Sequence, residues 1–158
     1  EMTFSLAAGL NWKGIDFSIL LQGAARSSIY LQQDIAWDNF WGNYYEEHIG
    51  RWTPETAATA TYPRFTKAAT AAHPNYYKSD YWLKDSKYLR LKNIQLGYTI
   101  PRKLLKKFGV RSLRVYANAY NLFTWDNVKK VDPESSNNSN GQFYPQQKVI
   151  NFGINLNF

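Results

Sequence analysis

Hydrophobic and polar residues alternate along five separate stretches of the chain, most regularly in the last one. From Ile150 to Phe158 every second residue is apolar, and Asn or Gly fills the positions between. A period of two is typical of a β-strand, because successive side chains point to opposite faces. A tilted strand of this length rises about 23 Å, close to the apolar band of a membrane β-barrel. A half-buried strand of a soluble sandwich explains this single stretch equally well.

The alternation predicts an all-β chain with five strands in antiparallel meander order. These strands are expected at about residues 3–12, 15–26, 81–100, 112–124 and 148–158. Lys13 and Gly14 form a plausible two-residue turn between the first two. Such a turn pairs Trp12 with Ile15 and continues with apolar pairs along one face, so a single turn satisfies the pattern of both strands.

The third predicted strand changes phase in its middle. Leu89 and Leu91 are out of step with the alternation that begins at Ile94. A β-bulge near Lys92-Asn93 would restore the phase. Alternatively, this half of the strand lies beyond the apolar zone, with Arg90 and Lys92 at a charged rim. Further on, residues 102–108 predict one basic helical turn that starts after Pro101 and closes at Gly109.

The connections between the strands alternate between short and long. Residues 27–80 and 125–147 form the two long ones, and the first of these is rich in aromatic residues, with a short helix expected from Asp34 to Ile49. In a meander, alternate connections lie at the same end of the sheet, so both long loops share one end. Membrane barrels have this asymmetry, with long extracellular loops and short periplasmic turns. Five strands cannot close a barrel, so we expect residues 1–158 to be the carboxy-terminal part of a larger one.

Composition narrows the class of protein. Aromatic residues make up 17% of the chain, which argues against disorder, and the net charge of +7 favours anionic partners without choosing among nucleic acid, lipid and lipopolysaccharide. The absence of cysteine excludes disulfides and thiolate metal sites. No apolar run reaches the roughly 18 residues of a transmembrane helix. We also expect no signal peptide, because the sequence opens directly in a strand pattern.

Several short motifs occur in an order that is specific to one family. They are Arg51-Trp52-Thr53-Pro54-Glu55, Tyr62-Pro63-Arg64, the run from Tyr88 to Pro101, Arg114-Val115-Tyr116, Asn121-Leu122-Phe123-Thr124, Asp132-Pro133-Glu134, Tyr144-Pro145 and the terminal Phe158. Together they resemble the carboxy-terminal segment of SusC/RagA-type TonB-dependent outer-membrane transporters. One departure is Thr56, where Asn is common in the family.

The resemblance implies that these strands are the last five of a transmembrane β-barrel of about 22 strands. It implies a plug domain, a TonB contact and a signal peptide, none of which is in this sequence. It also implies a SusD-like surface lipoprotein that covers the barrel, the barrel-assembly machinery and outer-membrane lipid as partners, and import of oligosaccharides or peptides into a Gram-negative bacterium. This chain would then supply barrel wall and extracellular loops.

Candidate site residues are aromatic. Ligand or lid contacts are expected from Trp37, Trp41, Tyr44, Tyr45 and Trp52, whose flat faces suit sugar rings or peptide side chains. The alternative for these residues is a small core of the loop itself. Trp12, Tyr98 and Phe158 are expected in the membrane girdle, and Phe158 also resembles the barrel-assembly signal.

Polar residues of the long loop indicate a ligand or metal site less clearly than the aromatic residues do. Asp38, Asn39 and Asn43 could bond a polar ligand, although a solvated surface explains them as well. His48 and His73 are too far apart in the sequence to indicate a metal site. We expect no catalytic residue, metal or cofactor, and nothing supports an enzyme. The chief rival function is a secreted carbohydrate-binding β-sandwich. A single-strand nucleic-acid binder is disfavoured because the sheet face is aliphatic.

Overall fold

The computed structural model describes the chain except residues 41, 68–71, 129–130, 136–143 and 145. It contains two compact units. The sheet unit comprises residues 1–27, 86–127 and 145–158, and the loop unit comprises residues 28–85 and 128–144. In the part of the chain that the structure describes, no helix is both long and apolar enough to cross a membrane.

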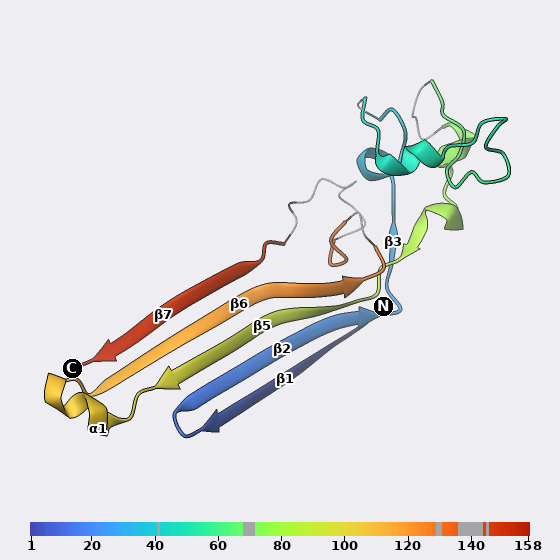
Figure 1. Cartoon of the computed structure of the whole chain (residues 1–158). Coiled ribbons are helices and arrows are strands. Elements are labelled where there is room, and N and C mark those ends of the chain that lie inside the picture. The colour runs from blue at the N-terminus through green and yellow to red at the C-terminus, as the bar shows by residue number, and fades with distance from the viewer. Residues whose placement is uncertain (41, 68–71, 129–130, 136–143, 145) are drawn as a thin grey trace. The chain divides into compact units, whose positions relative to one another are not determined.

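The sheet unit is built on five antiparallel strands in the order β1-β2-β5-β6-β7, which confirms the predicted meander (Figure 1). Their bounds are β1 Met2–Trp12, β2 Ile15–Ala25, β5 Tyr88–Thr99, β6 Ser112–Asp126 and β7 Val149–Asn157. Each strand pairs only with its neighbours in this order, so β1 and β7 form the edges of the sheet.

The β1–β2 hairpin has the register predicted from the sequence. Trp12 pairs with Ile15 and Leu10 with Phe17. Lys13 and Gly14 have φ angles of 47° and 86°, the positive values that a tight two-residue hairpin turn requires. A Cβ on Gly14 would lie 2.7 Å from the Thr99 carbonyl oxygen, so the neighbouring strand also requires glycine there.

The phase change in β5 is a β-bulge, as the first of the two sequence interpretations predicts. Leu91 pairs with Leu21 of β2 and Asn93 pairs with Leu20, so Lys92 is skipped in the register. The same residue is skipped opposite β6. The bulge keeps Leu91 on the face that carries Ile94, and it keeps Arg90 on the other.

The predicted strand 81–100 begins too early. Residues Asp80–Trp82 form a 3₁₀ helix (η4), and Leu83–Asp85 form a short strand, β4, that pairs with β3 (Ser28–Tyr30) in the loop unit. The polar run after Leu83 has no alternation, and regular pairing in the sheet starts only at Tyr88. Just before it, Ser86 is bonded to Ser27 through backbone and side chain, at 2.9 and 2.8 Å.

The prediction of a single helix from Asp34 to Ile49 is wrong. Two separate 3₁₀ helices occur there, η1 (Gln33–Ile35) and η2 (Glu46–Gly50), and a third, η3 (Pro74–Tyr76), lies further along. Asn39 and Gly42 have φ angles of 55° and 77°, which a continuous right-handed helix cannot accommodate.

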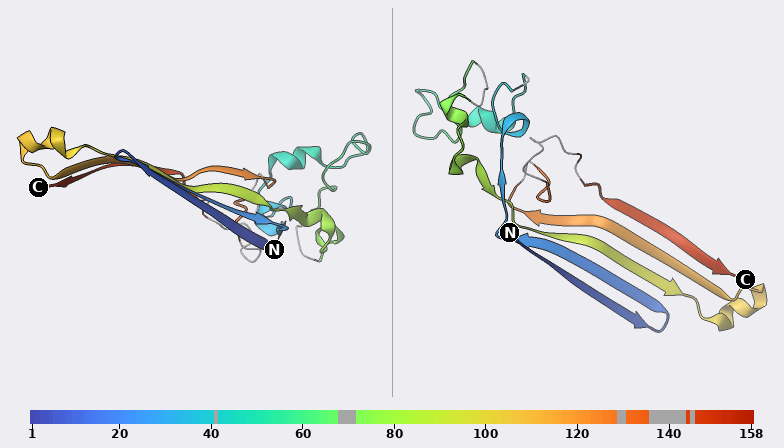
Figure 2. Two further views of the ribbon diagram at one scale, coloured as in Figure 1. Left: turned by 90° about the horizontal axis from the view of Figure 1, so that it is seen from below. Right: turned by 180° about the vertical axis from the view of Figure 1, so that it is seen from behind.

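The basic turn after β5 is confirmed. It consists of α1 (Arg102–Leu105) and η5 (Lys106–Phe108), and Gly109 ends it with φ of 70°. Arg111 donates its backbone N–H to the Asn157 carbonyl at 2.8 Å, so the turn lies beside the end of β7. Figure 2 shows the same end of the sheet, where α1 stands out from the plane of the strands.

Candidate functional site

One face of the sheet is apolar across all five strands. A single row joins Leu10, Phe17, Leu96, Ala117 and Phe152 through successive strand pairs. Neighbouring rows repeat the pattern. Leu10, Leu96 and Phe152 are 62%, 55% and 82% exposed, far more than a soluble core would allow. A contiguous apolar face of this extent marks a membrane or protein contact.

Large aromatic rings lie at the turn end of this face. Trp12 and Tyr98 both flank Ile15 in the row nearest the β1–β2 turn. Phe158 follows the end of β7. The three predicted girdle rings are 59%, 41% and 76% exposed, in the order Trp12, Tyr98 and Phe158. Amphipathic rings at the edge of an apolar band are typical of membrane interfaces.

The opposite face of the sheet is polar and carries an ion pair. Arg114 of β6 binds Asp16 of β2 through two hydrogen bonds of 2.9 and 2.5 Å. Gly97 of β5 lies between them, and a Cβ there would come within 2.5 Å of both partners. The missing side chain is therefore what lets the pair reach across the middle strand.

A second glycine on the polar face admits an aromatic ring. The Tyr116 ring covers Gly153 of β7, where a Cβ would lie 2.3 Å from the ring. The Arg114 guanidinium lies 4.8 Å from the centre of the same ring. The two glycines therefore support one continuous arrangement of Asp16, Arg114 and Tyr116 across the sheet.

The loop unit has its own hydrophobic core. Its most buried aromatic members are Trp37, Tyr62, Tyr76 and Trp82, each at most 6% exposed. Trp37 stacks on Tyr76 with ring centres 4.7 Å apart. The alternative considered for the aromatic group, a small core within the loop, therefore describes Trp37, whose ring is unavailable at the surface.

A buried carboxylate ties this core together. Asp38 is 1% exposed and accepts a hydrogen bond from the Thr66 backbone N–H at 3.0 Å. Its other oxygen lies 3.3 Å from the Tyr62 hydroxyl and also accepts from the Tyr76 hydroxyl. Of the two interpretations of Asp38, the solvated surface is wrong, because three partners from distant parts of the loop enclose this carboxylate.

His48 has a structural position in the same unit. It is 2% exposed, its Nδ1 accepts the Tyr45 backbone N–H at 3.0 Å, and its Nε2 lies 3.2 Å from the Ala36 carbonyl oxygen. His73 lies elsewhere and accepts from the Asn75 backbone N–H. Among the described residues no group of three potential metal ligands occurs.

The environment of the two tyrosines changes their ionisation. Burial, together with the Asp38 carboxylate, raises the pKa of Tyr62 well above the ordinary phenol value. The pKa of Tyr76 is raised for the same two reasons. Both hydroxyls therefore remain protonated donors at any physiological pH.

The remaining predicted contact residues differ in exposure. Tyr44 is 55% exposed, Tyr45 is 38% exposed and Trp52 is 40% exposed. Trp41 lies outside the described residues. Trp52 is held by a backbone bond from its N–H to the Tyr62 carbonyl, at 2.9 Å. The structure thus leaves three predicted rings available at the surface of the loop unit.

The turn after Trp52 is closed by the side chain of Thr56. Thr56 Oγ1 donates to the Arg51 carbonyl at 2.9 Å and accepts the Thr53 backbone N–H at 2.8 Å. These are bonds that a short polar side chain makes in a turn. Threonine therefore closes this turn with its own hydroxyl.

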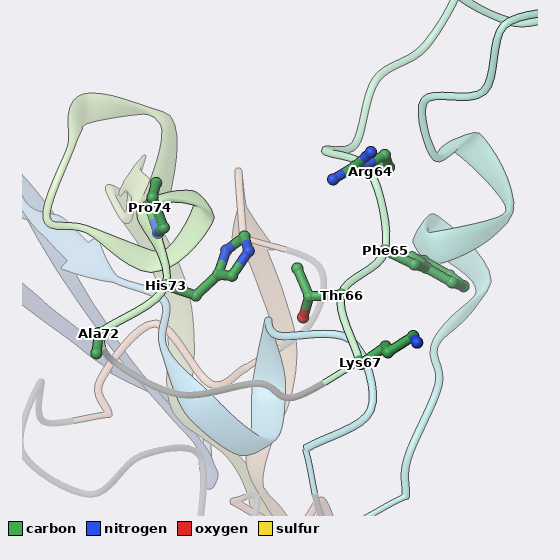
Figure 3. Close-up of a pocket in the computed structure, with 7 residues that line it drawn as sticks. All are labelled: Arg64, Phe65, Thr66, Lys67, Ala72, His73 and Pro74. Atoms are coloured by element: carbon green, nitrogen blue, oxygen red, sulfur yellow. The ribbon is translucent and has the colours of Figure 1, made fainter.

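Sequence reasoning did not find the open hollow of the loop unit, which has a cavity volume of about 730 Å³ (Figure 3). Residues 64–67 form one wall, and Ala72, His73 and Pro74 form the other. No periodic pattern relates these two segments, so the sequence carried no signal for them.

Comparisons with known proteins define the class. No protein-family model matches the chain. TonB-dependent receptor P26 of Formosa agariphila is 29% identical across the whole chain, and TonB-dependent receptor SusC of Bacteroides thetaiotaomicron is 25% identical across the whole chain. The chain spans 17% and 15% of the length of these two curated relatives. It is thus similar to a segment of the TonB-dependent receptors, which are outer-membrane proteins of Gram-negative bacteria.

Solved structures show which type of TonB-dependent receptor the chain resembles in fold. The match to the RagAB peptide importer in its closed-closed state covers 98% of this chain and 17% of the importer chain, with a TM-score of 0.75 and 24% identity. The RagAB peptide transporter matches 98% with a TM-score of 0.73 and 25% identity, over 16% of its chain. The resemblance to the SusC/RagA type is therefore confirmed, and the sheet has the fold of a RagA barrel segment.

Proposed function

We propose that the chain forms the carboxy-terminal wall and extracellular loops of an outer-membrane TonB-dependent nutrient importer. The observation that carries this proposal is the exposed apolar face that continues across all five strands. A soluble carbohydrate-binding sandwich would bury such a face, yet Phe152 and Leu10 are 82% and 62% exposed. Similarity to TonB-dependent receptors along the whole chain supports the same conclusion.

The proposal assigns a role to each unit. The sheet unit belongs to a larger barrel of about 22 strands, in which Trp12, Tyr98 and Phe158 contact the interface and Phe158 engages the barrel-assembly machinery. A plug elsewhere in the full protein contacts TonB. The loop unit presents Tyr44, Tyr45 and Trp52, with Trp41 in the same segment, to the imported ligand or to a SusD-like lipoprotein.

The imported ligand is an oligosaccharide or a peptide. The exposed rings support both classes, because sugars and peptide side chains both stack on flat aromatic faces. The RagAB structures are those of a peptide importer and a peptide transporter, and SusC is a TonB-dependent receptor. These names belong to the relatives, and growth tests must decide for the protein that contains this chain.

The test is uptake by cells that lack the full protein. We expect deletion to abolish growth on one class of nutrient, oligosaccharide or peptide, and the wild-type gene to restore it. A triple variant, Tyr44→Ala, Tyr45→Ala and Trp52→Ala, should reach the outer membrane at normal levels but lower uptake about tenfold. Tyr77→Ala, at a ring that is 57% exposed, is the matched control.

One result would overturn the whole proposal, and a second would overturn only the assigned aromatic contacts. Recovery of the full protein from the soluble fraction would remove the membrane role altogether. Normal uptake by the triple variant would retain the importer but would remove the assigned aromatic contacts.

A further inference from the structure

The turn between β5 and β6 has a surface that solubility does not require. Leu104 and Phe108 are 66% and 77% exposed, four residues apart, while Leu105 between them is buried at 7%. A turn that contacted only solvent would have polar side chains at its exposed positions. Two large apolar side chains directed outward on one short segment indicate a contact.

Cations surround this apolar pair. Arg102, Lys103, Lys106 and Lys107 are all exposed, and residues 100–111 contain no Asp or Glu. Arg111 follows two residues after the turn. The surface therefore combines an apolar centre with a rim of positive charge that no local carboxylate neutralises.

Neighbouring elements place this surface at the end of the apolar sheet face. Ile100 donates its backbone N–H to the Leu113 carbonyl at 2.9 Å, and Leu113 pairs with Leu156 of β7. An apolar row thus leads directly into the turn. Figure 1 shows α1 beside the carboxy terminus, at the same end as the β1–β2 turn.

The β1–β2 turn adds a further cation at this end. Thr99, the last residue of β5, donates its backbone N–H to the Gly14 carbonyl at 2.7 Å. Lys13 of that turn has its Nζ 4.8 Å from the centre of the Trp12 ring. An aromatic ring with a cation beside it is suited to the boundary between acyl chains and phosphates.

We propose that this surface, the α1–η5 turn with Leu104 and Phe108 at its centre, binds the anionic phospholipids of the periplasmic leaflet. Leu104 and Phe108 enter the acyl boundary, and the four cations of the turn bind headgroup phosphates. This inference rests on the proposed membrane function. The observations favour lipid over an acidic protein partner because the turn continues an apolar face that already needs lipid.

The test uses the full protein, reconstituted from detergent into bilayers of phosphatidylglycerol and phosphatidylcholine in equal amounts. Native mass spectrometry then counts the lipids that remain bound. We expect the wild type to retain phosphatidylglycerol preferentially. The variant Lys103→Gln, Lys106→Gln and Lys107→Gln should lower that preference about tenfold, and high salt should do the same.

Two further variants separate the contributions. Arg64→Gln, Lys67→Gln and Lys78→Gln remove the same charge from exposed positions of the loop unit and should leave the preference unchanged. Leu104→Ser with Phe108→Ser removes only apolar surface and should lower retention of both lipids. Because both side chains are exposed, folding should not change.

The outcomes are decisive. Equal retention of the two lipids by the wild type, or an unchanged lipid preference in the turn variant, would overturn the proposal. The cations of the turn would then serve solubility or bind an acidic protein. A protein that fails to insert into bilayers at all, detected by the absence of a heat-modifiable folded band, would instead contradict the proposed membrane function.

Discussion

At the scale of single residues, the loop unit depends on a carboxylate as well as on its aromatic rings. Asp38 accepts bonds from side chains and backbone at positions up to 38 residues away. A buried acceptor with several donors fixes one arrangement, because each donor left without it would lose its bond away from water. Trp52 is joined to this interior through the bond from its backbone N–H to the Tyr62 carbonyl.

Replacing the carboxylate tests this dependence. Asp38→Ala should destabilise the loop unit by about 2–4 kcal/mol, because it removes the carboxylate that accepts from the Thr66 N–H and the Tyr76 hydroxyl. Hydrogen exchange of residues 28–85 in the full protein is the measurement. Glu46→Ala, at an exposed carboxylate, is the control. Unchanged protection in the Asp38 variant would contradict this account.

The raised pKa values of Tyr62 and Tyr76 give a pH prediction. Folding favours their neutral form, so the stability they contribute is complete below the ordinary phenol pKa of about 10 and is lost as the pH rises through the folded values. Absorbance titration at alkaline pH should show a fraction of the tyrosine side chains that ionises late, together with unfolding of the loop unit.

Two phenylalanine variants test whether the late-ionising tyrosines are Tyr62 and Tyr76. Tyr62→Phe and Tyr76→Phe should each reduce the late fraction, and Tyr77→Phe, at an exposed ring, should leave it in place. Completion of the whole tyrosine titration within the ordinary phenol range would refute the assignment.

At the scale of elements, glycines determine which side chains cross the polar face. Gly97 lies beneath the Asp16–Arg114 pair, and Gly153 lies beneath the Tyr116 ring. Gly9 on β1 has a much freer position, with only the Phe17 carbonyl oxygen near, at 3.5 Å. Glycine therefore has different importance in different strands of the same sheet.

This difference predicts unequal effects of one substitution. Gly97→Ala should cost about 1–3 kcal/mol, because a methyl group displaces the ion pair. Gly9→Ala should be nearly neutral. The urea concentration at which the refolded protein loses its heat-modifiable band measures both. Equal midpoints for the two variants would show that the ion pair has free space to move.

Sequence reasoning succeeded for elements whose signal is local. Alternation and a two-residue turn predicted the hairpin register, and the bulge was one of the two interpretations of the phase change near Lys92. The start of β5 and the interior of the long loop were missed. Tyr62 and Tyr76 reach Asp38 across 24 and 38 residues through irregular backbone, and no periodic pattern encodes such contacts.

At the scale of the whole molecule, the two sheet faces require opposite environments. Phe152 and Asn151 are adjacent in β7, yet the first lies in the apolar row and the second pairs with polar Asn118. In a barrel the first face contacts lipid and the second faces the interior.

Arginine at the two positions should therefore have unequal effects. Phe152→Arg should destabilise the membrane-inserted full protein by about 2–4 kcal/mol, and Asn151→Arg should cost under about 1 kcal/mol. The equilibrium between folded and urea-unfolded protein in vesicles measures both. A larger cost at Asn151 would reverse the assignment of the faces.

Because of the bulge at Lys92, a change of length by one residue at this point would reverse the faces of half of β5. If Lys92 were deleted, residues 88–91 would shift by one place and present their other side to each surface. Arg90, now 3% exposed with its Nε 2.9 Å from Thr124 Oγ1, would then lie on the apolar face of the sheet. One extra lysine thus keeps residues 88–91 of β5 in phase with residues 93–99 of the same strand.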